Sequence, residues 1–370
     1  MINNKKFNFG AGPCILPEQV LMRAGEAVKQ WDQAGLSILE ISHRSPQFEG
    51  VMLETENLVR ELLAVPADYS VLFLQGGASM QFCMVPMNFL QGNKNGATYL
   101  DAGYFANKAA REAKLFGLVD SITAVEENGK STIPQDYTIP GHTAYFHCTS
   151  NNTIEGTQMR RFPGTNVPVV CDMSSDIFSR RIDVSQFDLI YAGAQKNMGP
   201  AGMTLVIAKN SFLDSVSHGV PSMLDYRIYR DHQSMYNTPP VFAIYTAMLN
   251  LHWLKGLGGV DRIEMQNREK AALLYDEIER NPLFYGTANV NDRSMMNVTF
   301  RMHDQTREPG FLDFAQKHGM VGIKGYRTVG GFRASLYNAL PLESVSALVN
   351  CMRTYENTSY KQLITSETYQ

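Results

Sequence analysis

Apolar residues recur at two different spacings along the first 260 residues of the chain. Between residues 15 and 64 they recur every three or four positions, which predicts two amphipathic helices. From residue 70 onward there are short, almost continuous apolar runs, each closed by glycine or polar residues, as in parallel strands buried on both faces. Helical stretches at 79–90 and 106–117 separate some of these runs, which predicts an α/β fold with a mostly parallel sheet. The expected strands lie within 70–77, 96–103, 142–151, 167–175, 187–197 and 203–210.

The pattern changes after a long apolar helix expected at 239–256. Helices are then predicted at 263–280, 311–319 and 342–357, and strands at 295–302 and 332–339. Residues 359–370 carry no periodic signal. This second part is typical of a smaller α+β domain. We therefore expect a large domain over 15–258 and a small domain formed by 1–14 and 259–370.

The composition is that of a folded chain with a large core. Of the 370 residues, 44% are hydrophobic and 19% charged, and the net charge of −3 comes without basic clusters, which argues against nucleic acid or membrane partners. The start of the chain lacks the apolar segment of a signal peptide, and the five cysteines form no CxxC pair, which indicates reduced thiols in the cytoplasm. His142 and His147 lie five residues apart, and Cys148 follows His147. No carboxylate or second cysteine nearby completes a tetrahedral set of metal ligands, so we expect no metal site.

Three expected strand ends carry candidate functional groups. After Leu74, the sequence Gly76–Ser79 leads into a helix, which suits a phosphate but equally a tight turn. Asp172 follows the apolar run 167–171, where a carboxylate could pair with a ligand cation or cap a turn. Lys196 follows the run 187–193, where it is either a surface lysine or a partly desolvated amine that acts as a nucleophile.

Taken together, these three strand ends match the needs of pyridoxal phosphate. This cofactor requires an amine for its aldehyde, a carboxylate for its ring nitrogen and an anion site for its phosphate. Asp172 and Lys196 end successive expected strands, so both can face one ring. Lys196 would then also transfer the substrate proton as general base and acid.

Several longer stretches match one enzyme family. They read FNFGAGPCILP, ISHRSPQFEG, GGASMQF, AGAQKNMGPAG, MYNTPP and KGYRTVGGFRASLYNA. On these motifs, nearly the whole chain resembles the phosphoserine aminotransferases, which are fold-type I, class V pyridoxal-phosphate enzymes. The resemblance implies that an amino group is exchanged between glutamate and 3-phosphohydroxypyruvate, giving O-phosphoserine and 2-oxoglutarate in serine biosynthesis.

The resemblance also implies a role for each matching position. Lys196 would carry the cofactor and Asp172 would pair with its ring nitrogen. Further cofactor contacts would come from Ala78, Ser79, Phe105, Thr153, Gln195, Asn237 and Thr238. Arg333 would hold the substrate α-carboxylate, and the substrate phosphate or the distal carboxylate of glutamate would be held by His43, Arg44 and Arg327. In the family the Asn-Thr pair reaches the phosphate in the partner subunit, which implies a homodimer with shared active sites.

Some positions and alternatives stay open at this stage. Phe105 stands where many members have tryptophan, and Tyr326 where histidine is common. Thr238 is placed to cap a helix beginning at Pro239. The alternatives are a serine–glyoxylate or alanine–glyoxylate aminotransferase, a cysteine desulfurase, or a non-catalytic binding protein with the same fold. The resemblance leaves open whether 4-phosphohydroxythreonine, a compound of the vitamin B6 route, is a second substrate.

Overall fold

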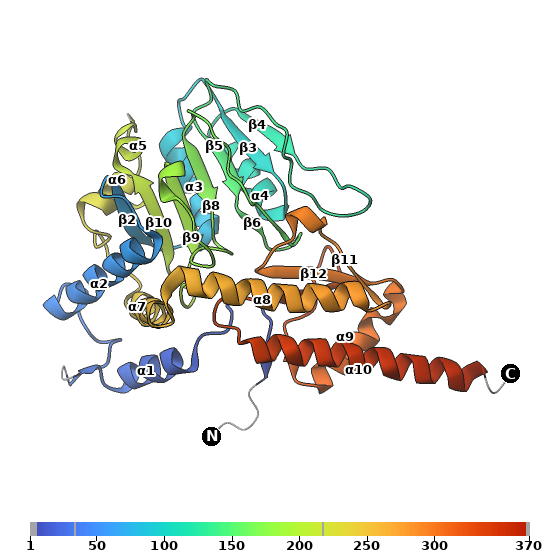
Figure 1. Cartoon of the computed structure of the whole chain (residues 1–370). Helices are drawn as coiled ribbons and strands as arrows, with labels where there is room; N and C mark the ends of the chain where they lie inside the picture. Colours follow the sequence, from blue (N-terminus) through green and yellow to red (C-terminus); the bar gives the residue numbers. More distant parts are fainter. Residues whose placement is uncertain (1–5, 33–34, 217, 368–370) are drawn as a thin grey trace.

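A seven-stranded sheet forms the centre of the large domain in the computed structural model, which describes residues 6–32, 35–216 and 218–367, with side chains up to residue 358 (Figure 1). Its strand order is β2-β10-β9-β8-β5-β3-β4. All neighbours pair in parallel except β10, which is antiparallel to β2 and β9. The predicted α/β fold with a mostly parallel sheet is therefore confirmed. The strands are β2 (Tyr69–Leu74), β3 (Ala97–Asp101), β4 (Val119–Thr123), β5 (Phe146–Thr149), β8 (Val169–Asp172), β9 (Leu189–Gly193) and β10 (Thr204–Lys209).

Helices bury both faces of this sheet. In β9, Ile190 and Ala192 join one apolar cluster, whereas Leu189 and Tyr191 join the cluster on the opposite face. Burial on both faces explains why the strands are almost continuously apolar. The first cluster is covered by α1 (Glu18–Lys29), α2 (Pro46–Leu63) and α7 (Val241–Gly256), and the second by α3 (Gly77–Phe89), α4 (Tyr104–Ala113), α5 (Asn210–Asp214) and α6 (Tyr226–Asp231).

The differences from the predicted elements have local causes. The edge strand β4 was missed because Asp120, Ser121 and Thr123 are exposed, so the strand lacks an apolar run. The strand expected from residue 142 begins only at Phe146, after a turn closed by a Thr143 N–H bond to the Pro140 carbonyl. In the opposite direction, α10 (Leu342–Glu367) continues well past its predicted end at residue 357.

A second sheet and a third apolar cluster form the small domain. Its antiparallel strands are β11 (Phe284–Gly286), β12 (Asn297–Met302) and β14 (Phe332–Ser335), and its helices are α8 (Gly259–Arg280), α9 (Glu308–Lys317) and α10. The chain start joins this domain because β1 (Phe7–Asn8) pairs with β13 (Met320–Val321), and Phe9 is buried in its cluster. These contacts join residues 7–9 to the small domain. We propose the divisions at residues 14/15 and 258/259 as the domain boundaries; residues 1–5 and 368–370 lie outside the described ranges.

Helix α8 connects the two domains. Figure 1 shows it extending from beneath the large sheet to the small-domain strands. Val260 and Ile263 at its start belong to a large-domain cluster, whereas Ala271, Leu274 and Ile278 belong to the small-domain cluster. The same rigid element therefore packs in both cores.

Helix α7 is apolar around most of its circumference because it lies against α1 and α2. Its length of 16 residues suits this buried position. Within the described ranges, no helix combines the length and apolar character needed to cross a membrane.

Candidate active site

The carboxyl ends of β2, β8 and β9 lie at one edge of the large sheet. Since β10 is antiparallel to both β2 and β9, these two strands run in the same direction. The loops that follow them surround a cavity of about 360 Å³. Eight of the predicted site residues line it: Ala78, Ser79, Phe105, Thr153, Asp172, Gln195, Lys196 and Arg333. This is where ligands bind in open α/β sheets.

Lys196 lies in the turn directly after β9 and is half-buried. Its Nζ donates a hydrogen bond of 2.9 Å to Thr153 Oγ1 and lies 5.8 Å from the centroid of the Phe105 ring. Burial lowers the pKa of Lys196 to about 8, although the nearby charge of Asp172 acts in the opposite direction. The amine is therefore available as a nucleophile much closer to neutral pH than an ordinary lysine.

Asp172 is the last residue of β8 and is 4% exposed. Burial raises the pKa of its carboxyl group, while hydrogen bonds from Ser174 and the charge of Lys196 lower it. Its Oδ1 accepts a 2.8 Å bond from Ser174 N, and no Lys or Arg within the described ranges forms an ion pair with it. A buried carboxylate in this position is suited to a cationic nitrogen on a ligand.

The turn between β2 and α3 has the local geometry that suits an anion. Gly76 and Gly77 have φ values of +87° and +63°, which glycine adopts without strain, and a Cβ on Gly76 would lie 2.5 Å from Met80 Cβ. No side chain caps α3, and its first turn has no acidic residue. Its amide groups and dipole are therefore available to a phosphate at Ala78 and Ser79.

Arg333 on β14 brings a cation from the small domain to the cavity wall. In the described part of the chain no carboxylate forms an ion pair with it, and its Nε is buried without a hydrogen-bond partner. Burial lowers the pKa of its guanidinium. An arginine left in this state suits a carboxylate ligand, which can accept two parallel hydrogen bonds.

Tyr326 also lines the cavity. Its ring centroid lies 5.2 Å from that of Tyr104, at the start of α4, and a hydrogen bond with Tyr104 raises the pKa of the Tyr326 phenol. The position where the family commonly has histidine is thus occupied by a neutral donor that contacts the large domain.

Five predicted residues do not line this cavity: His43, Arg44, Asn237, Thr238 and Arg327. Arg44 and Arg327 are exposed on loops. The Thr238 carbonyl accepts a 3.0 Å bond from Gln75 Nε2, so its segment lies beside the glycine turn.

The predicted helix cap at Thr238 is wrong. Helix α7 begins at Val241, with Pro240 in the cap position and no side-chain cap. The physical reason is the second proline of the pair, because a residue that precedes proline is restricted to extended conformations, so Pro239 cannot open the helix.

The N-terminal segment had no predicted role in the site, although it packs on the lysine turn. A Cβ on Gly12 (φ +123°) would lie 3.1 Å from Lys196 Cγ. Cys14 Sγ donates a 2.7 Å bond to the Lys196 carbonyl oxygen, and Cys14 N bonds to the Gln195 carbonyl oxygen. The only local signal for this contact was the pair of glycines in FNFGAGP.

Comparison with known proteins identifies the family. The family pattern described as Aminotransferase class-V matches residues 6–348. Phosphoserine aminotransferases from Flavobacterium psychrophilum and Bacteroides thetaiotaomicron are 55% and 54% identical over 354 residues, which cover 95% of this chain and 99% of each relative. The chain belongs to the phosphoserine aminotransferase family. The predicted family and the predicted enzyme class, an aminotransferase, are confirmed.

Solved structures agree with this assignment. A phosphoserine aminotransferase from Bacillus circulans subsp. alkalophilus has a TM-score of 0.92 and 43% identity, covering 96% of this chain and 99% of its own. One from Trichomonas vaginalis, described as bound to PLP, has a TM-score of 0.89 and 35% identity, covering 94% and 100%. An alanine–glyoxylate aminotransferase from Nostoc sp. is 16% identical with a TM-score of 0.76 over 96% of each chain, and this likeness shows the fold alone.

The lowered pKa of Lys196 predicts a pH dependence for its amine. In cofactor-free protein, acylation of Lys196 should increase with pH around a midpoint near 8, because the protonated form that prevails below the pKa is not nucleophilic. Mass spectrometry after short labelling pulses at a series of pH values would measure the rate. A midpoint near that of an ordinary lysine, about 10.4, would contradict the desolvated site.

Proposed function

We propose that this chain is a pyridoxal-phosphate-dependent phosphoserine aminotransferase. It transfers an amino group between glutamate and 3-phosphohydroxypyruvate and yields O-phosphoserine and 2-oxoglutarate. The observation that carries the proposal is one cavity that joins a desolvated amine, a buried carboxylate, an open helix start and an unpaired arginine. The family's named activity and its close relatives support the same assignment.

The cavity residues fit pyridoxal phosphate. When bound, this group supplies an electron-accepting ring that stabilises negative charge on the substrate α-carbon. Lys196 would hold its aldehyde carbon and Asp172 its ring nitrogen, while Phe105 offers an aromatic face. The start of α3, with Ala78 and Ser79, would hold the phosphate together with Gln195.

Lys196 also moves the proton of the reaction. Its amine has a pKa close enough to neutral to accept the substrate α-proton and to return it. The Thr153 hydroxyl, 2.9 Å from Nζ, orients this amine. Asp172 keeps a negative charge next to the lysine and so favours its protonated form after the transfer.

Substrate binding requires two anion sites. Arg333 would bind the α-carboxylate common to all four substrates and products. The second site must accept a phosphate or a distal carboxylate, which are the roles proposed for His43, Arg44 and Arg327. A glyoxylate aminotransferase needs no phosphate site. The presence of His43, Arg44 and Arg327 therefore favours a phosphoserine aminotransferase over that alternative.

A homodimer with shared active sites accounts for the residues that do not reach the cavity of their own chain. Asn237 and Thr238 would contact the cofactor phosphate of the partner, and His43 and Arg44 would contact its substrate. The buried Nε2 of His43 has no hydrogen-bond partner, as expected for a group completed by a ligand.

The state of the cysteines bears on the location of the protein. All five are unpaired, even Cys148 and Cys171, whose Sγ atoms lie 3.7 Å apart. Unpaired thiols are typical of a reducing compartment, so they support the cytoplasm as the location.

A half-reaction tests the proposed function. Protein loaded with pyridoxal phosphate should absorb at about 410 nm and lose this band on addition of phosphoserine or glutamate, but not of serine at equal concentration. Lys196→Ala should lack the band, because the amine that binds the aldehyde is absent. Including 4-phosphohydroxythreonine in the series decides whether it is a second substrate. A response to serine equal to that of phosphoserine would contradict the phosphate specificity.

Arg333→Ala should weaken both amino acid substrates. Loss of a desolvated bidentate partner for the α-carboxylate predicts about 2–4 kcal/mol of lost binding for glutamate and phosphoserine alike. The substrate dependence of the same absorbance change measures the dissociation constants. Arg262→Ala, at an exposed position of α8, is the matched control and should leave them unchanged. Equal dissociation constants for Arg333→Ala and Arg262→Ala would show that Arg333 does not bind the substrate.

Mixed dimers test the shared sites. Lys196→Ala and Asn237→Ala should each be impaired alone, but random subunit exchange should restore about a quarter of wild-type activity, because half the dimers would contain one intact site. The activity after mixing purified variants measures this recovery. No recovery, with exchange shown by tagged subunits, would place Asn237 in its own chain's site, and full activity of Asn237→Ala alone would place it in neither.

A further inference from the structure

The turn 176–179 follows Asp172 by a few residues and lies in the interior between the two domains. Its residues Asp176, Ile177, Phe178 and Ser179 are each at most 3% exposed. Phe178 has a φ of +59°, a value that costs energy in a residue with a side chain. Such a turn lacks the backbone pairing of a helix or strand, so its buried carbonyl groups need other donors.

Side chains supply a donor to each of four successive carbonyl groups in this turn. The Asp176 carbonyl accepts from Ser179 Oγ at 2.6 Å. The other three accept from asparagine Nδ2 atoms of distant segments: Ile177 from Asn197 at 3.1 Å, Phe178 from Asn338 at 2.9 Å and Ser179 from Asn267 at 3.0 Å. The turn is thus attached to the lysine turn, the small domain and α8.

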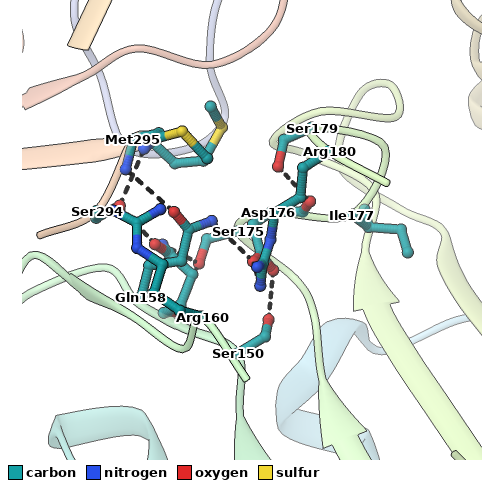
Figure 2. Close-up of polar contacts among 12 residues, drawn as sticks. Ser150, Gln158, Arg160, Ser175, Asp176, Ile177, Ser179, Arg180, Ser294 and Met295 are labelled. Atoms are coloured by element: carbon teal, nitrogen blue, oxygen red, sulfur yellow. Dashed lines mark hydrogen bonds and ion pairs between the residues drawn. The ribbon is translucent and has the colours of Figure 1, made fainter. Parts of the chain in front are cut away.

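The Asp176 carboxylate anchors the start of the turn (Figure 2). Its Oδ2 accepts bonds of 3.0 Å from Gln158 Nε2 and 3.2 Å from Arg180 Nη2, and its Oδ1 accepts from the Ser150 hydroxyl. Ser150 N in turn donates to the carbonyl oxygen of Asp172 at 2.9 Å. A buried carboxylate with this many donors is fully compensated, so the turn has a defined position relative to Asp172.

Asn197 has a special place in this network because it directly follows Lys196. Its Nδ2 donates to the Ile177 carbonyl, and its Oδ1 accepts from Asn338 N at 3.0 Å. Its own carbonyl oxygen accepts from Asn250 Nδ2 at 2.9 Å. The side chain is 4% exposed, so water does not compete for these bonds. One amide therefore joins the lysine turn, the segment after Asp172 and the small-domain residue Asn338.

We propose that Asn197 is a positioning residue of the amino transfer: its side-chain amide fixes the Lys196 turn relative to the Asp172 segment. The inference rests on the proposed function, because it assigns Asn197 a role in the reaction of Lys196 and Asp172. A displacement on the order of 1 Å at a reacting group is sufficient to slow a reaction strongly. The charged and titratable groups that act on Lys196 are Asp172, Asp176, Arg333 and Cys14, and two of them belong to the segment that Asn197 holds.

Asn197→Ala tests this role in the cofactor-loaded protein. The pH midpoint of its visible absorbance should fall by roughly half a unit or more, because looser placement weakens the effect of both carboxylates on the lysine nitrogen. Its kcat should fall roughly tenfold or more, while the KM for glutamate changes by less than about twofold, because the hydrogen bonds of the Asn197 side chain go to Ile177, Asn338 and Met296 and not to Arg333.

Asn88→Ala is the matched control. Asn88 is 1% exposed and also donates two amide bonds to carbonyl groups, those of Met84 and Leu224, but it belongs to neither the turn nor the cavity. Both variants should lower the melting temperature, and only Asn197→Ala should move the absorbance midpoint and kcat. Asn197→Ser, which leaves a smaller cavity but cannot reach Ile177, is measured in parallel in case the alanine variant does not fold.

The outcomes separate this proposal from the proposed function. An unchanged midpoint and kcat in a folded Asn197 variant that has lost stability would show a purely structural amide and overturn the positioning role. If Asn88→Ala shifted the midpoint equally, the effect would be general and the proposal would also fail. Wild-type protein that shows no visible band with pyridoxal phosphate would instead contradict the proposed function itself.

Discussion

The parallel pairing of β8 with β9 is the constraint on which the site depends. Asp172 is paired in register with Tyr191, two residues before β9 ends at Gly193. Parallel strands deliver their carboxyl ends to the same edge, so the lysine turn begins beside the buried carboxylate. In an antiparallel pair the two groups would lie at opposite edges. Burial disfavours the charged form of both Asp172 and Lys196. The attraction between their opposite charges partly offsets this cost for each group.

Hydrogen-bond partners differ between the turn behind the cavity and two groups at the cavity wall. The carbonyl groups of the 176–179 turn and the Asp176 carboxylate accept bonds from protein donors. Arg333 Nε and Thr149 Oγ1 belong to residues that line the cavity and are buried without partners, as are Arg180 Nε and Asn267 Oδ1 within the network of the turn. Since an unpaired buried polar group is unfavourable, the two groups at the cavity wall are suited to a ligand.

The small domain contributes to the site through a few specific attachments. Its strand β14 carries Arg333 to the cavity, and Tyr326 reaches across to Tyr104 of the large domain. Its position is set by α8, which packs in both cores, and by the chain start, where Tyr337 Oη donates to the Ala11 carbonyl at 3.0 Å. The distance between the carboxylate-binding arginine and Lys196 is therefore a property of the domain interface.

The sequence by itself determined the sheet and the chemistry at its strand ends. Continuous apolar runs identified β2, β8, β9 and β10, because burial on both faces leaves no polar positions, and the interruption of those runs marked Gly76, Asp172 and Lys196. The antiparallel direction of β10 and the exposed edge strand β4 were not predictable, since direction leaves no periodic signal and β4 has no apolar run.

Only the tertiary structure decided which polar residues act together. Asn197, Asn267 and Asn338 are far apart in the chain and individually ordinary. They meet at one turn, where they supply the donors for the carbonyl groups of Ile177, Ser179 and Phe178. In the same way, the close approach of Gly12 to Lys196 depends on the placement of the N-terminal segment, whose strand β1 pairs with β13 of the small domain. Local patterns record the burial of each residue and its helical or strand periodicity, whereas contacts between distant segments depend on how the elements pack.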